Sequence, residues 1–201
     1  MQIENHKEAV PLFHYLARFR QADPMEMAKR TRTNWDGKHF YVQLLHRSHV
    51  ITHPEGKIST LAGEEVPLQT QTFLLRWLLE GRAAAWTGAW KTFGELPWGE
   101  TYRGPYARRI LMRAALTFGR RMEAFRSACG AVGGLPVEQG DGGYEFSLIG
   151  NFKMRILIWE EDEEFPPSAQ ILYSDNFAAG FTAEDRVVAA EILISTIKKH
   201  M

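Results

Sequence analysis

The spacing of apolar residues along the chain predicts four well-marked helices. The first covers residues 8–19, and a short second helix begins at Asp23-Pro24, because aspartate caps helices and proline fits their first turn. A third covers residues 68–79, and the last follows Thr182. The positions expected to face the core are Val10, Phe13, Leu16 and Ala17 in the first helix, Phe73, Leu74, Trp77 and Leu78 in the third, and Val188, Ile192 and Ile197 in the last.

Alternating and β-branched stretches predict strands. Residues 38–61 are expected to form a two- or three-stranded meander, with Phe40, Val42 and Leu44 on one face. Residues 144–149 and 152–159 flank a Gly150-Asn151 turn, and residues 170–173 supply a third strand. Further helices are expected from Pro105 and over residues 121–128, and residues 86–98 are expected to be loop. The pattern predicts an α+β fold, a single domain over residues 1–201 with antiparallel sheet packed against several helices.

Composition narrows the class of protein. The chain has 201 residues, 45% of them hydrophobic, which is enough for a substantial core. Lys plus Arg balance Asp plus Glu at 24 each, so the formal net charge is zero. An overall electrostatic attraction to nucleic acid or to a membrane surface is therefore not expected. The single cysteine, Cys129, excludes an internal disulfide framework and suits a reducing compartment. Residues 1–7 do not resemble a signal peptide, so we expect a cytoplasmic location.

Histidines are the first candidates for chemistry. His46, His49 and His53 lie within eight residues, with His39 nearby. On a strand, His49 and His53 share one face and His46 points the other way, so a metal site would need a carboxylate from elsewhere. The same imidazoles could be axial ligands of a tetrapyrrole. The simpler interpretation is that they are exposed strand histidines, and the sequence predicts no metal site.

Two charged segments are the second candidates. Residues 160–164 carry five adjacent carboxylates, and seven arginines lie between Tyr102 and Gly130 against one acid. Both could simply be solvated faces. Alternatively Arg108 or Arg109 pairs with the acidic segment across the fold. In an enzyme, Glu163 or Glu164 would then be a general base and the arginine would hold an anionic substrate.

Aromatic residues are the third candidates. Trp86, Trp90, Phe93 and Trp98 follow one another closely and could line a pocket for a flat ligand. They could equally cap a core or form an exposed patch for a protein partner.

Several strings in the chain resemble a known family. They are Thr87-Gly88 to Trp90, Phe93, Glu95-Leu96-Pro97, Tyr102, Trp159-Glu160, residues 162–168 and residues 182–185. They resemble an uncharacterised prokaryotic family, domain of unknown function 3786, over about residues 67–198, after the N-terminal helices and meander of residues 1–66. The family is associated with anaerobes, and some members carry a cysteine-rich iron–sulfur segment, which this chain with Cys129 alone cannot supply. The resemblance implies no established activity.

Three functional hypotheses follow. The first is an accessory binding domain for a small cofactor-like ligand, a corrinoid or other tetrapyrrole, that uses Trp86, Trp90, Trp98, Trp159 and Asp162. The second is the enzyme with the glutamate base, and the third is a protein-interaction module. The first two assume that the aromatic and acidic segments meet around one concavity.

Overall fold

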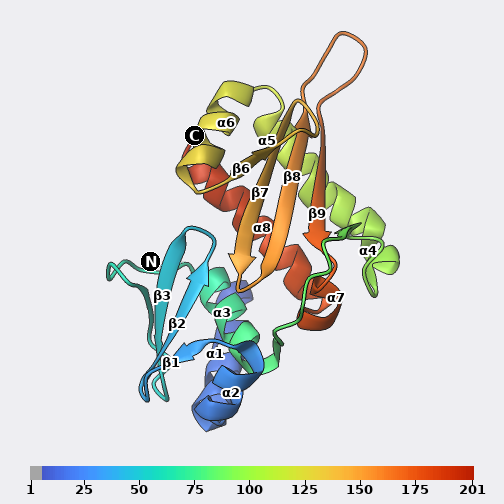
Figure 1. Cartoon of the computed structure of the whole chain (residues 1–201). Helices are drawn as coiled ribbons and strands as arrows, with labels where there is room; N and C mark the ends of the chain where they lie inside the picture. The colour runs from blue at the N-terminus through green and yellow to red at the C-terminus, as the bar shows by residue number, and fades with distance from the viewer. Residues whose placement is uncertain (1–5) are drawn as a thin grey trace. The chain divides into compact units, whose positions relative to one another are not determined.

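The computed structural model describes residues 6–201, and the chain divides into two compact units, one ending at Ala83 and the other running from Ala84 to Met201 (Figure 1). Each unit has its own antiparallel strands and its own helices. The predicted α+β class, with antiparallel sheet packed against helices, is confirmed. That the whole chain is one domain stays a prediction.

The N-terminal unit packs three helices with a small sheet. The helices are α1 (His6–Gln21), α2 (Pro24–Thr31) and α3 (Leu68–Glu80), and the strands are β1 (Asn34–Trp35), β2 (His39–Leu44), β3 (Arg47–Thr52) and β4 (Ile58–Thr60). The strands pair antiparallel in chain order. Phe40, Val42 and Leu44 are buried on one face of β2, which confirms the predicted meander.

Local signals place two of these helices where the sequence predicts them. The side chain of Asp23 accepts a hydrogen bond from the backbone N–H of Met25 at 2.9 Å, which caps α2. The apolar stripe of α3 is buried as expected, and Gly81 follows its last turn. In α1 the predicted face is wrong. Leu12 and Phe19 are buried, whereas Val10 and Phe13 are exposed, because α1 carries two apolar stripes and the core takes only one.

The C-terminal unit is a sheet backed by helices (Figure 1). Its strands are β5 (Trp90–Thr92), β6 (Leu135–Val137), β7 (Gly142–Ile149), β8 (Phe152–Trp159) and β9 (Ser168–Ser174), and they pair antiparallel in the order β6-β7-β8-β9-β5. Its helices are α4 (Gly99–Tyr106), the π-helix η1 (Ala107–Leu111), α5 (Met112–Phe118), α6 (Met122–Ala131), α7 (Phe177–Gly180) and α8 (Ala183–Lys199).

The core of this unit lies between the sheet and its helices. Alternate residues of β8, namely Phe152, Met154, Ile156 and Ile158, are fully buried beneath α5 and its neighbours. Helix α8 begins at the predicted capping box, in which Thr182 and Asp185 exchange side-chain and backbone hydrogen bonds. None of the helices within residues 6–201 is both long and apolar enough to cross a membrane.

Two elements of this unit differ from the sequence prediction. The segment expected to be loop contains the edge strand β5. The helix expected to start at Pro105 starts six residues earlier, at Gly99. Gly99 packs so closely on Phe93 that a Cβ would lie 1.7 Å from the Phe93 carbonyl oxygen, which fixes the helix start there. Pro105 then lies inside the helix, and the wide π-turn follows directly after it.

Candidate functional site

The aromatic segment is fastened to the sheet of the C-terminal unit by side chains from two turns. Asp175 accepts hydrogen bonds from the backbone N–H and the hydroxyl of Thr87, at 3.2 and 2.5 Å. The side-chain amides of Asn151 and Asn176 both donate to the carbonyl of Ala84. These contacts hold the chain ahead of β5 in one path.

The fastening brings two of the predicted ligand-binding residues together. The rings of Trp86 and Trp90 lie 5.3 Å apart, edge to face. Lys153 lies 5.0 Å from the Trp86 ring centroid and Arg155 lies 4.1 Å from that of Trp90, which are distances of cation–π contacts. Neither cation was identified from the sequence, since only the pairing of strands places β8 residues beside the indoles.

Glu145 completes this group on the same face of the sheet. Its carboxylate accepts hydrogen bonds from Lys153 at 2.7 Å and from Arg155 at 2.9 Å. Burial raises the pKa of Glu145, but the hydrogen bonds from the two cations outweigh burial and the net pKa lies below its ordinary value. Each ring therefore already has a cation as a partner and each cation a carboxylate, so this cluster is suited to holding β5 on the sheet.

The aromatic and acidic segments do not meet. Trp90 pairs with Ser174 at one end of β9, whereas Trp159 pairs with Ser168 at the other end. Ser168 and Ser174 are six positions apart on β9, a span of about 20 Å at the usual rise per residue. Trp98 is 77% exposed and lies just before the first residue of α4. The assumption that both segments surround one concavity is therefore wrong.

The acidic loop, residues 160–167, projects beyond the ends of β8 and β9 (Figure 1). Asp162 orders its tip: the Oδ1 atom accepts the backbone N–H groups of Glu164 at 2.9 Å and Phe165 at 2.7 Å. Asp162 thus has a local structural role within the tip. Glu163, Glu164 and Phe165 are exposed to solvent.

An arginine does pair with the acidic loop, but it is Arg120 and not Arg108 or Arg109. Arg120 makes a two-pronged ion pair with Glu161 at the base of the loop. Arg109 instead makes a two-pronged pair with Glu191 of α8, at 2.7 and 3.1 Å. Arg108 is exposed, and among residues 6–201 it has no ion pair. An arginine pairs with the acidic loop as predicted, but the predicted residue is wrong. Several arginines follow one another at helical spacing, and the sequence does not say which of them reaches the loop.

The interpretation of the histidines as exposed strand residues is wrong: His49 is buried, and His39, His46 and His53 are half-buried. His49 is 4% exposed on β3, and burial lowers its pKa. The Nε2 atom of His53, in the following turn, lies 3.1 Å from the carbonyl oxygens of Phe19 and Ala22. Within the described part of the chain, no three His, Cys, Asp or Glu side chains are grouped so as to hold a metal ion. Cys129 is buried, and burial raises the pKa of its thiol well above the ordinary value, so it is a poor nucleophile.

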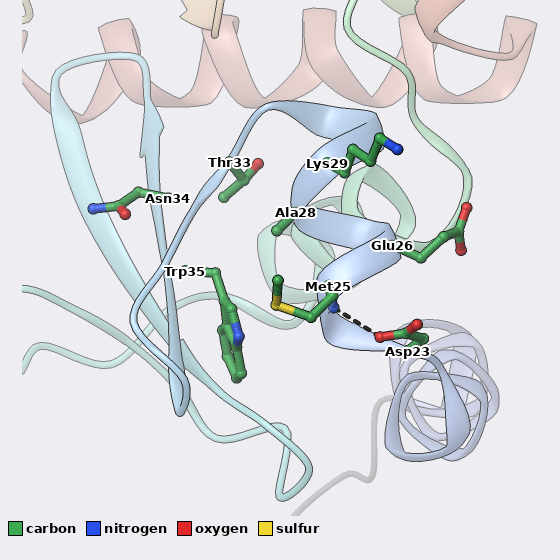
Figure 2. A pocket seen from close by; sticks show the side chains of 8 residues that line it. All are labelled: Asp23, Met25, Glu26, Ala28, Lys29, Thr33, Asn34 and Trp35. Atoms are coloured by element: carbon green, nitrogen blue, oxygen red, sulfur yellow. Dashed lines mark hydrogen bonds between the residues drawn. The ribbon is translucent and has the colours of Figure 1, made fainter.

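An open groove lies on the N-terminal unit between α2 and β1 (Figure 2). Its volume is about 620 Å³, within the range of ligand sites. The groove is not evident from the sequence, because only the short strand β1 brings these residues opposite α2. Its lining residues are Asp23, Met25, Glu26, Ala28, Lys29, Thr33, Asn34 and Trp35.

The middle of the groove is apolar. Met25 on α2 and Trp35 on β1 lie opposite one another, the thioether of Met25 extends toward the indole, and Ala28 lies next to Met25 on the helix (Figure 2). Met25 is 66% exposed, although it is large and apolar. The Trp35 ring packs on Phe40 with centroids 4.4 Å apart, which holds the indole in position.

Two polar side chains of the lining are already engaged within the unit. The carboxylate of Asp23 caps α2, and the Thr33 hydroxyl accepts hydrogen bonds from Thr31 and from the Trp77 indole N–H. The side chains of Lys29 and Asn34 make no hydrogen bond or ion pair within residues 6–201, so both side chains are free to meet a ligand at the rim.

The fold and groove define an α+β protein with antiparallel sheet packed on helices and an open, mainly apolar groove in its N-terminal unit. The chain belongs to the family called domain of unknown function (DUF3786), whose model matches residues 23–196. The match begins at Asp23, so it includes α2 and the groove, which precede the strings that carry the resemblance. No curated protein and no solved structure matches the chain.

Proposed function

We propose that the chain is a non-catalytic binding domain that holds a small, flat, mainly apolar ligand in the groove between α2 and β1. The observation that carries the proposal is the pair Met25 and Trp35, two large apolar side chains facing one another across open space (Figure 2). Exposed apolar surface is stabilised when it is covered, and a thioether adapts readily to a flat ring.

The chemistry of the lining favours binding over catalysis. The groove has no histidine, cysteine or serine among its lining residues, and its Asp23 carboxylate is committed to capping α2. The alternative enzyme hypothesis relied on Glu163 or Glu164 together with Arg108 or Arg109, but the acidic loop meets Arg120 instead. Glu163 and Glu164 are exposed at the tip of this loop, whereas Arg109 pairs with Glu191 of α8.

A corrinoid or other tetrapyrrole remains one candidate for the ligand. The groove would cover one edge of such a macrocycle, and its lining offers no imidazole as an axial ligand. We therefore expect a tetrapyrrole to bind through contacts of its ring face and edge with Met25 and Trp35. A cytoplasmic location and a prokaryotic source stay predictions.

Titration of the full chain tests the proposal. The probes are haem, hydroxocobalamin and anilinonaphthalene sulfonate, followed by absorbance or fluorescence and by the melting temperature. We expect at least one to bind, and Ala28→Trp, which fills the groove, to weaken that binding by about tenfold or more.

Ala124→Trp is the matched control, since Ala124 is also a half-buried alanine on a helix but lies in the C-terminal unit. It should leave binding unchanged. If none of the probes binds, or if Ala28→Trp binds as well as the unaltered chain, the proposal is wrong.

A further inference from the structure

One face of the helical segment α4–η1–α5 is exposed and combines positive charge with apolar side chains. Met112 and Leu116 are 54% and 61% exposed, one helical turn apart. Arg108 lies one turn before Met112, and Arg109 and Arg113 flank this line toward α8. We call these five residues the arginine ridge. Its net charge is positive, because within residues 6–201 only Arg109 of its three arginines has a carboxylate partner, Glu191.

The tip of the acidic loop has the complementary composition. Phe165 is 65% exposed, and the side chains of Glu163 and Glu164 make no hydrogen bond or ion pair within residues 6–201. Asp162 orders the tip and Arg120 fastens its base, so little ordering entropy would be lost on binding.

The tip does not reach the ridge of its own chain. The base of the loop lies at the end of α5, where the backbone N–H of Glu161 donates to the Gly119 carbonyl. From there the loop projects away from the helices (Figure 1). Met112 lies eight residues before Arg120, about 12 Å back along the helical segment.

The reach of the loop matches this distance in a second copy. Eight residues folded back on themselves extend at most about 13 Å beyond the strand ends. Two copies related by a two-fold axis can lie antiparallel, with the bases of their acidic loops side by side. Each loop then runs along the other copy, and its tip reaches the partner's Met112. Such an arrangement repeats one contact twice and closes on itself.

We infer that the arginine ridge binds the acidic loop of a second copy of this chain. Phe165 covers Met112 and Leu116, and Glu163 and Glu164 pair with Arg108 and Arg113. The contact area of two loop tips is small, so the dimer is weak and forms at high protein concentration. It does not depend on the groove or on a ligand.

Sedimentation velocity of the full chain at low and high salt tests the inference. We expect a monomer–dimer equilibrium whose dimer fraction falls as salt screens the charges. Arg108→Glu and Glu164→Arg should each lower the dimer affinity by about tenfold or more, since like charges then face one another in both contacts.

A mixture of the two variants gives the sharpest result. In the mixed dimer, one contact keeps its native charges and the other has both charges exchanged, so association should return. Arg103→Glu is the control: Arg103 is exposed on the same helical segment, pairs with Glu100 and lies outside the ridge, so it should leave the dimer intact. A chain that is monomeric throughout, or a dimer indifferent to Arg108→Glu, would overturn the inference.

Discussion

Arg186, at the start of α8, is a cation buried in the C-terminal unit with 1% of its surface exposed. It donates to the carbonyl oxygens of Thr182 at 3.1 Å and Pro97 at 2.8 Å, while its Nη1 atom has no hydrogen-bond partner among residues 6–201. Burial lowers its pKa. The contact with Pro97 ties α8 to the chain that precedes α4, so Arg186 fastens two segments distant in sequence.

Because of this contact, we expect removal of the Arg186 guanidinium to lower the stability of the fold substantially. Arg186→Met should lower the free energy of unfolding by about 2–4 kcal/mol, because hydrogen bonds from a charged donor are strong and the Pro97 carbonyl loses the guanidinium as its partner. Arg103→Met, at an exposed position, should change it by about 0.5 kcal/mol or less. Urea denaturation of both variants measures the difference, and equal costs would contradict this role.

His49 predicts a specific dependence of stability on pH. Burial lowers its native pKa, so the unfolded chain, with an ordinary histidine pKa of about 6.5, binds more protons over the interval between the two values. The stabilising contribution is present above the unfolded pKa and is lost as the pH falls from about 6.5 toward the native pKa.

Urea denaturation between about pH 7.5 and about pH 5.5 checks this sign, because that interval brackets the ordinary histidine pKa. The unaltered chain should lose more free energy of unfolding over the interval than the non-titrating variant His49→Gln. Parallel pH profiles for the two proteins would show that His49 does not carry the effect.

Among the elements, helix α1 shows that the apolar pattern alone does not determine which face of a helix is buried. Its predicted stripe and its buried stripe are both apolar, and only packing in the N-terminal unit selects Leu12 and Phe19. Leu12→Ala should therefore cost about 2–5 kcal/mol of unfolding free energy. Val10→Ala should cost about 0.5 kcal/mol or less. Thermal or urea unfolding of the two variants measures both costs. A larger cost for Val10→Ala than for Leu12→Ala would show that the face predicted from the sequence is the one that packs in the core.

Elements with strong local signals were predictable from the sequence. Helices α2 and α8 have capping residues, and β7 and β8 flank a glycine turn, so local chemistry decides their position. The short strands β1 and β5 were not predictable, because two or three residues carry no period and only their partners define them. The groove depends on β1 and was missed for the same reason.

For the whole molecule, the sequence identified the segments worth examining but not their neighbours. Trp86 and Trp90 do meet, yet their partners Lys153 and Arg155 come from a strand more than sixty residues away in the chain. The acidic loop and the aromatic segment lie at opposite ends of β9. The pairing of strands determines which segments lie close together, and this pairing cannot be derived from the composition of the segments.

The central claim is that the groove between α2 and β1 holds a ligand against Met25. Nuclear magnetic resonance of the chain with carbon-13 methionine methyl groups tests it most directly, with Met25→Leu assigning the signal. The account predicts that the binding probe shifts the Met25 methyl signal and leaves that of Met112, a similarly exposed methionine in the other unit, in place. A bound probe that leaves the Met25 signal unmoved would contradict the account.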